Sequence, residues 1–176
     1  MILKEDKLEF DFDDQAWSQV IKFDKHPDYE KIKDEVPETR GVDFTGILNE
    51  DTFVAIEVKD FRGFKTHENK REEPLDIEVA KKIVGTLATI SASCRASVNY
   101  EIFWQTYLNL IQDRQKSVYV ILWKEEDPLP SRQKRLAAKR SVQWQKLKER
   151  LSWLGCKTLI TNSNDYNPNK LKLKVK

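Results

Sequence analysis

The sequence predicts an α/β fold in which a mixed β-sheet is flanked by helices. Two runs, residues 42–48 and 52–61, have the composition of strands and are separated only by the short turn 49–51. After them, stretches with apolar residues at helical spacing alternate with shorter apolar runs of strand length. A strand meander followed by alternating helices and strands indicates a mixed sheet covered by helices.

Length and composition favour one domain. The 176 residues, 39% hydrophobic and 34% charged, are typical of a soluble domain, so residues 1–176 are expected to fold as one unit. No apolar run reaches transmembrane length, and the first residues lack the basic flank and apolar stretch of a signal peptide. We therefore expect a cytoplasmic protein without a membrane partner. Cys94 and Cys156 lack zinc-ligand spacing and are expected to be packing residues.

Charge is distributed unevenly along the chain. Residues 131–176 contain 13 lysines and arginines but only 2 acidic residues, a net charge of +11, whereas the first 130 residues carry −9. A basic surface of this kind suits a polyanion such as nucleic acid. The plainer interpretation is a solvated helix face followed by a charged tail.

The N-terminal segment is ambiguous. Asp13 or Asp14 is a plausible N-cap for a short helix, although residues 20–24 could equally form a strand. Pro27 is expected to open a further helix, because proline is favoured at the first helical position.

The later elements follow from apolar periodicity. Helices are expected over residues 76–91, 99–113 and 132–154, and strands over 117–123, 157–162 and 171–176. The second of these helices carries an aromatic stripe that is expected to be core. Gly155 is expected to end the third helix as a C-cap, and the last strand to lie at a sheet edge.

The turn at residues 49–51 sets a register between the first two strands. If this turn is a three-residue hairpin loop, Leu48 pairs with Thr52, and Asp43 lies across from Glu57. Lys59 shares the face of Glu57, because alternate residues of a strand point the same way. The opposite face is almost entirely apolar and consists of Val42, Phe44, Gly46, Leu48, Val54, Ile56 and Val58.

Opposed carboxylates in a sheet repel unless something positive lies between them. Asp43 and Glu57 together offer the hard oxygen ligands that Mg²⁺ or Mn²⁺ prefers, and Lys59 adds a cation that can pair with a phosphate oxygen or orient and help deprotonate an attacking water. The alternative is a salt bridge of Lys59 with Glu57 or Asp43 on a hairpin face exposed to water.

These residues resemble the motif of the PD-(D/E)xK nuclease superfamily, which has the restriction-endonuclease-like fold. The motif is found here in "RGVDF" and "AIEVKDF", with Val42 in place of the usual proline, and "FVAIEVKDFRGF" also resembles a bacterial subgroup. The resemblance implies Mg²⁺-dependent (or Mn²⁺-dependent) hydrolysis of phosphodiester bonds, in DNA rather than RNA. It implies Asp43 and Glu57 as metal ligands, the carbonyl of Val58 as a candidate backbone ligand, and Lys59 as the catalytic cation.

The resemblance also implies two auxiliary positions. Some members of the superfamily use an acidic residue on the first helix, for which Glu30 and Glu35 are candidates, and a polar residue on the helix after the motif, for which Glu78 and Lys82 are candidates. The spacing does not choose among these four.

The residues around the motif have separate interpretations. Asp60 points away from the face of Glu57 in a regular strand and is expected to be structural, whereas Arg62 returns to the site side. His26 and His67 have no ligand-like spacing and are expected in loops or at the surface.

A basic stretch near residue 140 is the candidate nucleic-acid surface. The residues assigned to nucleic-acid binding are Arg62, Arg132, Lys134, Arg135, Lys139 and Arg140. No helix-turn-helix, zinc-finger or RNP-type motif accompanies them, so sequence-specific recognition is not expected.

Two other functions stay open. One is a catalytically silent nuclease-like domain that binds nucleic acid or a partner protein. The other is a structural protein, a homodimer for example, with its aromatic helix as the interface.

Overall fold

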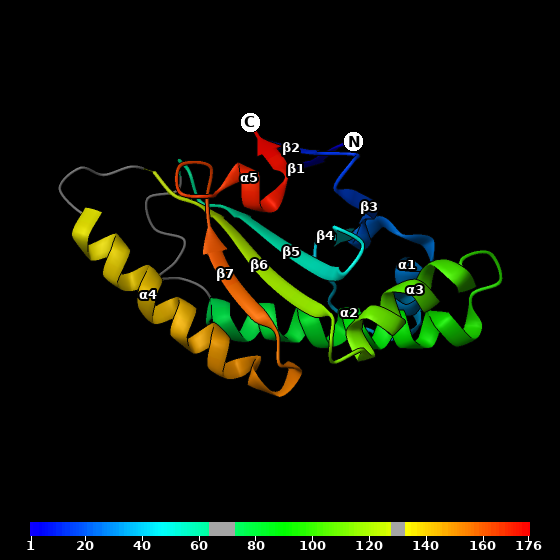
Figure 1. The fold of residues 1–176 in the computed structure, drawn as a ribbon. Helices are drawn as coiled ribbons and strands as arrows, with labels where there is room; N and C mark the ends of the chain where they lie inside the picture. The colour runs from blue at the N-terminus through cyan, green and yellow to red at the C-terminus, as the bar shows by residue number, and fades with distance from the viewer. Residues whose placement is uncertain (64–72, 128–132) are drawn as a thin grey trace.

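The computed structural model describes residues 1–63, 73–127 and 133–176, and within the last range it describes side chains from residue 138 onward (Figure 1). Its centre is a five-stranded sheet with the strand order β3-β4-β5-β6-β7. These strands are β3 (Trp17–Lys22), β4 (Phe44–Leu48), β5 (Thr52–Asp60), β6 (Ser117–Glu125) and β7 (Lys157–Thr161). The pairs β3–β4 and β4–β5 are antiparallel, whereas β5–β6 and β6–β7 are parallel, which confirms the mixed sheet.

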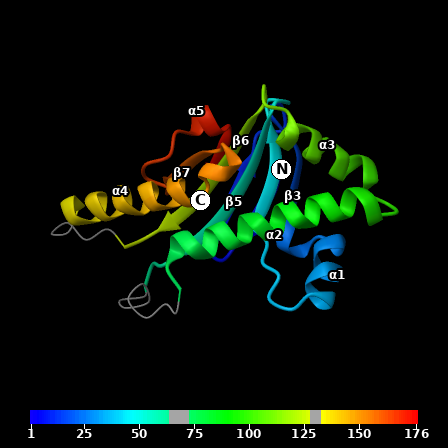
Figure 2. The same cartoon turned by 90° about the horizontal axis from the view of Figure 1, so that it is seen from below.

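Helices cover one face of this sheet, as seen in Figure 1 and, from below, in Figure 2. Two of them, α2 (Leu75–Ala96) and α3 (Glu101–Gln112), lie in the connection from β5 to β6, and α4 (Gln133–Arg150) lies in the connection from β6 to β7. Parallel neighbours require such crossovers, because the chain must return to the starting end of the sheet. The remaining helices are short: η1 (Phe23–Lys25), α1 (Pro27–Glu35), η4 (Ser152–Leu154) and α5 (Pro168–Leu171).

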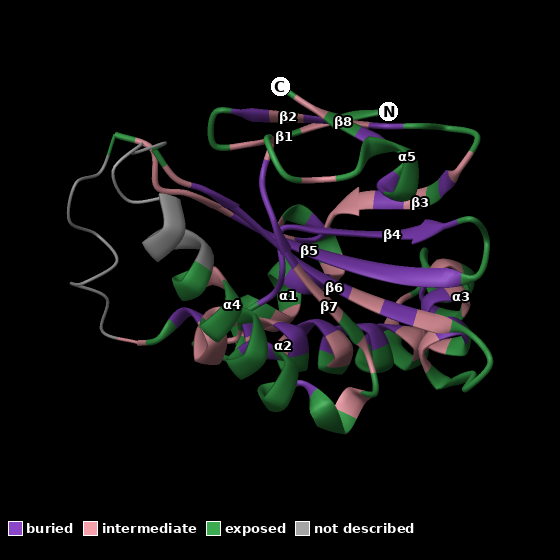
Figure 3. Cartoon of the chain, turned by 60° about the vertical axis from the view of Figure 1, so that its left-hand side comes forward, coloured by how far each residue is buried: buried purple, intermediate pink, exposed green. Residues whose placement is uncertain are grey.

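A second, three-stranded sheet covers the other face (Figure 3). Its strands, in the order β1-β2-β8, are β1 (Ile2–Glu5), β2 (Leu8–Phe12) and β8 (Leu173–Val175), so it joins the two ends of the chain. The expected edge strand near the C-terminus is therefore confirmed as β8.

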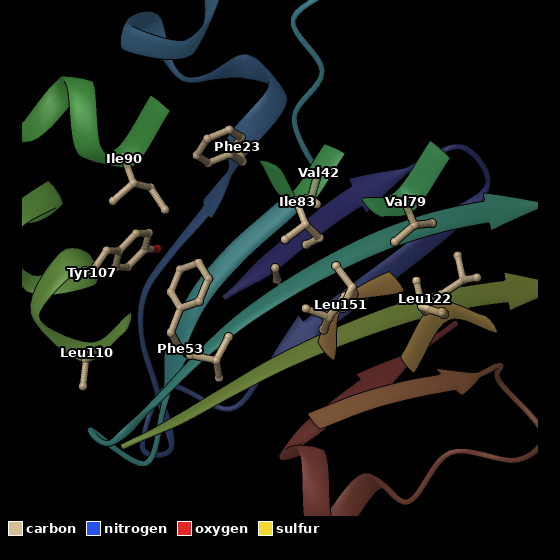
Figure 4. Packing of buried hydrophobic residues seen from close by; sticks show 14 of the residues in the cluster. Phe23, Val42, Phe53, Val79, Ile83, Ile90, Tyr107, Leu110, Leu122 and Leu151 are labelled. Atoms are coloured by element: carbon tan, nitrogen blue, oxygen red, sulfur yellow. The ribbon is translucent and has the colours of Figure 1, made fainter. Parts of the chain in front are cut away.

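Strand β5 is buried on both faces because it lies between these two layers. Phe53 and Ala55 belong to the helix-side cluster, which Figure 4 shows around Phe53, Val79 and Ile83. Val54 and Ile56 belong to the cluster beneath the small sheet. The alternative of a hairpin face open to water is therefore wrong for β4 and β5.

The predicted hairpin register is confirmed. Leu48 pairs with Thr52 and Phe44 pairs with Ile56, and Asn49 and Glu50 have positive φ angles of 51° and 61° in the turn. One residue was assigned to the wrong face of the hairpin: Val42 lies in the helix-side cluster. It precedes β4 and so does not follow the strand alternation, and its backbone N–H donates to Thr86 Oγ1 of α2 at 3.1 Å.

The predicted helix after Asp13 is wrong, and the strand alternative over residues 20–24 is correct only in part, because the strand spans residues 17–22 and a 3-10 helix follows it. Asp13 Oδ1 accepts a hydrogen bond from the Gln15 N–H in a turn only, at 3.0 Å. Residues 17–22 instead pair with β4, with Trp17 buried and its Nε1 donating to the Leu171 carbonyl at 2.7 Å. Pairing with a neighbouring strand overrode the local capping signal.

The helix predicted at Pro27 is confirmed, but its N-cap is a histidine. His26 Nδ1 accepts the Asp28 N–H at 3.2 Å, and the ring packs against Tyr100 and Trp104. His26 lies in the connection between η1 and α1, as the loop expectation has it, but at 8% exposed it is not a surface residue. His67 lies outside the described residues.

The later helices and strands follow the predicted order, with shifted ends. In α3, Trp104 and Tyr107 are fully buried, so its aromatic stripe is core and does not offer these rings as an interface. In α2, Val84 is 53% exposed, although it is one of the apolar residues at helical spacing that predict this helix. Gly155, with φ of 65°, follows α4 and η4 as the predicted stop. Cys94 and Cys156 are unpaired and pack against the helix-side cluster, as predicted.

None of the helices in the described ranges is both long enough and apolar enough to cross a lipid bilayer.

Candidate active site

Four charged side chains meet between β5 and α2. Glu57 and Lys59 project from the helix-covered face of β5, and Glu78 and Lys82 lie one turn apart on α2. Lys59 Nζ lies 2.8 Å from Glu57 Oε1 and 2.9 Å from Glu78 Oε1. Lys82 Nζ lies 2.7 Å from Glu57 Oε1 and 2.8 Å from its Oε2. The structure therefore brings both candidates on the second helix into the site.

Asp43 reaches the same place from the start of β4. Its Oδ2 accepts the Val58 backbone N–H at 2.6 Å, and its Oδ1 lies 3.6 Å from Lys82 Nζ. Asp43 is 6% exposed and Glu57 is fully buried. The two carboxylates predicted from the register thus share one ammonium neighbour.

Burial governs the protonation of these groups. The pKa of Glu57 is raised from 4.5 to about 7, first by burial and then by repulsion from the charge of Asp43. Burial also raises the pKa of Asp43, against the opposing effects of Lys82 and the Val58 N–H. For Lys59, burial disfavours the charged form, but the Glu57 and Glu78 carboxylates outweigh it and raise its pKa. Lys59 is therefore protonated at neutral pH.

A second group of carboxylates includes Asp43. One carboxylate oxygen from each of Glu5, Asp24 and Asp43 lies within 4.8 Å of the others, in positions at the end of β1, in η1 and before β4. Lys22 Nζ pairs with Glu5 Oε2 at 2.7 Å. Asp24 Oδ1 is a buried atom without a hydrogen-bond partner in the described part of the chain.

The donor set fits a divalent cation. Around Asp43, the linked carboxyl groups are Glu5, Asp24, Asp43, Glu57 and Glu78, and the linked ammonium groups are Lys22, Lys59 and Lys82. Glu57 Oε1 is also a buried oxygen without a well-oriented hydrogen bond among the described residues, although two ammonium groups lie close to it. Carboxylate oxygens of this kind are ligands for a hard metal ion.

The carboxylates grouped with Asp43 do not include either candidate for the first-helix acid. Glu30 and Glu35 are both exposed, and the acidic group beside Asp43 comes from Asp24, immediately before α1, and from Glu5. Sequence reasoning missed Asp24 because it lies in the segment that was ambiguous between helix and strand. Glu5 lies at the end of β1 in the small sheet, and no local pattern in the sequence predicts that this sheet packs beside Asp43.

Arg62 does not return to the site side. Strand β5 ends at Asp60, and the Arg62 guanidinium folds back on the Asp60 carboxylate, with Nε at 2.8 Å from Oδ1 and Nη2 at 2.6 Å from Oδ2. The alternation that placed Arg62 beside Glu57 no longer holds past the end of the strand. Asp60 is structural, as predicted, through this pair.

The candidate nucleic-acid surface is only partly described. Lys139 is exposed on α4, and Arg140 is half-buried and pairs with Asp165. Arg132 lies outside the described residues, and the side chains of Lys134 and Arg135 do too, although their backbone belongs to α4. Further along α4, Trp144 is 37% exposed and Lys148 lies over its ring at 5.2 Å.

Comparisons of this chain with protein-family models, with curated proteins and with solved structures found no match.

Proposed function

We propose that the protein is a metal-dependent nuclease that hydrolyses phosphodiester bonds, with DNA as the preferred substrate. The observation that carries the proposal is the buried pair Asp43 and Glu57, with Lys59 beside it at the carboxyl end of β5. Burying like charges together is costly, and a strongly raised pKa at such a place is typical of a functional site. The order of a strand meander, a helix and a parallel strand also supports a restriction-endonuclease-like fold.

A divalent ion would be held by Asp43 together with Glu57, or together with Glu5 and Asp24. When bound, it supplies Lewis-acid stabilisation of the charge that develops on the phosphate and a bound water of lowered pKa. Groups of the protein itself position the two carboxylates. The Asp43 carboxylate is oriented by the Val58 N–H, and in the ion-free protein the Glu57 carboxylate pairs with the Lys59 and Lys82 ammonium groups.

Lys59 serves as a fixed positive charge. Because its pKa is raised, it keeps its proton at neutral pH and is a poor general base. It can stabilise negative charge on a phosphate oxygen, and Glu78 holds it in position at 2.9 Å. This favours electrostatic stabilisation by Lys59 over deprotonation of the attacking water.

One observation favours a second candidate, a silent nuclease-like domain that binds nucleic acid or a partner protein. Glu57 is compensated by two ammonium groups, so the site is satisfied as a set of salt bridges. Such a domain would keep the basic helix α4 and would not depend on a metal ion.

Cleavage of several nucleic acids separates these functions. Supercoiled plasmid, linear DNA, single-stranded DNA and RNA are incubated with Mg²⁺, with Mn²⁺ and with a chelator. We expect cutting of DNA that requires the ion. If no substrate is cut with either ion and the protein still binds nucleic acid tightly in a salt-sensitive way, the protein is the silent binding domain and not a nuclease.

Binding by α4 is expected to be electrostatic. Changing the exposed Lys139 to Glu should weaken DNA binding regardless of sequence and lower the slope of log affinity against log salt by about 1 to 2, because counterion release scales with the phosphates neutralised. Fluorescence anisotropy at several salt concentrations measures this. Lys33→Glu, an exposed lysine on α1, is the matched control. Equal salt slopes for wild type and Lys139→Glu would remove α4 from the DNA surface.

A further inference from the structure

Lys82 lies where the two central carboxylates converge. Its Nζ is 2.7 and 2.8 Å from the two oxygens of Glu57 and 3.6 Å from Asp43 Oδ1. Within the described residues, the ion pairs of Lys82 are all with these two carboxylates. Lys59 differs, because Glu78 gives it a partner outside the pair.

An ammonium group in this position competes with a cation for the same oxygens. Carboxylate oxygens that bind Mg²⁺ lie about 2.1 Å from the ion, and two positive charges within about 4 Å of each other repel strongly in a buried site. A divalent ion shared by Asp43 and Glu57 therefore requires Lys82 to leave them.

The backbone of α2 cannot make that movement easily. Thr86 Oγ1 donates to the Lys82 carbonyl at 2.8 Å and accepts the Val42 N–H at 3.1 Å, which ties this turn of α2 to the segment before β4. At Gly85, a Cβ atom would lie only 2.0 Å from the Arg40 carbonyl oxygen, so the helix and that segment are in direct contact. The Lys82 side chain is 17% exposed, which leaves it a route toward solvent.

We propose that Lys82 is a phosphate-binding residue that the carboxylate pair holds until a divalent ion takes its place. With an ion bound, Asp43 and Glu57 would no longer hold the Lys82 ammonium, which would then be available to a phosphate group of the substrate. This role of Lys82 rests on the proposed nuclease function, which identifies the phosphate ligand as that of a nucleic acid. Lys59, held by Glu78, stays in place during the exchange.

Chemical labelling of lysine amines tests the exchange without measuring activity. The protein is treated briefly with acetic anhydride, with and without Mg²⁺ or Mn²⁺, and the modified lysines are quantified by mass spectrometry. Labelling of Lys82 should rise by roughly tenfold with the ion, the factor that corresponds to losing an interaction of about 1.4 kcal/mol. Lys81, which is exposed and paired with Glu73, is the internal reference and should not change.

Calorimetric titration in the same buffer reports whether the ion binds. Unchanged or reduced labelling of Lys82 when the ion binds would overturn the exchange, and so would absence of ion binding. If Lys82 labelling rises with the ion but the protein cuts no nucleic acid, the exchange is supported and the nuclease function is rejected. If the protein cuts nucleic acid but Lys82 labelling does not rise, the nuclease function is supported and the exchange is rejected.

The phosphate contact is tested by DNA affinity in Ca²⁺ and in chelator. Lys82→Met should lose most of the ion-dependent gain in affinity, about tenfold for one charged phosphate contact, when the affinity of each variant in saturating Ca²⁺ is compared with its own affinity in chelator. Lys81→Met should keep the gain. An equal ion-dependent gain in Lys82→Met and wild type would contradict a phosphate contact by Lys82.

Discussion

Glu57→Gln is expected to reduce ion-dependent cutting by about 10³-fold, because the substitution keeps the shape of the side chain but removes the charge that would bind the ion. The rate of plasmid cutting at saturating Mg²⁺ measures this. Glu149→Gln, which changes an exposed glutamate on α4, is the matched control and should cut as wild type does. Full activity in Glu57→Gln would remove Glu57 from the site.

The same substitution is expected to stabilise the protein at about pH 8 when no ion is bound. The folded protein raises the pKa of Glu57 from 4.5 to about 7, so between these values the native state binds more protons than the unfolded state. The contribution of Glu57 to stability is therefore fully present below about pH 4.5 and is lost as the pH rises through about 7. The loss is on the order of 3 kcal/mol.

Urea unfolding in chelator at about pH 5 and about pH 8 detects this contribution. The difference in unfolding free energy between Glu57→Gln and wild type should grow in favour of the variant as the pH rises. Since the ion binds the ionised carboxylate, cutting by wild type should also increase as the pH rises through about 7. A stability difference that does not change with pH would show that Glu57 is not held with a raised pKa.

Lys59→Met is expected to lower the cutting rate by about 10² to 10³-fold while the protein still binds the ion. The variant removes the fixed charge beside the phosphate but leaves Asp43 and Glu57 in place. Single-turnover cutting measures the rate, and calorimetry measures ion affinity in the same preparation. Lys174→Met, at an exposed position of β8, should match wild type in both.

Two results would contradict this role for Lys59. Cutting at the wild-type rate would show that the ammonium is dispensable. If Lys59→Met loses both ion binding and cutting, Lys59 acts by organising the carboxylates.

The centre of the site was predictable because strand alternation and hairpin geometry are local rules. The positions of Asp43, Glu57 and Lys59 follow from the three-residue turn and a period of two. Val42 and Arg62 lie just outside the regular strands, where that period ends, and both were misplaced for this reason.

The other half of the site depends on packing between distant segments. Glu78 and Lys82 both face β5 because of the rotation of α2 about its axis, which is set by Val79 and Ile83 in the core. Glu5 comes close to Asp43 because the small sheet packs on the large sheet, where Lys22 of β3 pairs with Glu5. No local pattern in the sequence predicts that contact between Glu5 and Asp43.

The anomalous density of Mn²⁺ in crystals of the wild-type protein tests the central claim most directly. We predict the strongest peak within bonding distance of an Asp43 carboxylate oxygen, with either Glu57 or the pair Glu5 and Asp24 supplying the next ligand. A peak shared by Asp43 and Glu57 should be accompanied by withdrawal of Lys82. Absence of a peak at Asp43 from crystals that bind Mn²⁺ elsewhere would contradict the metal site and, with it, the proposed chemistry.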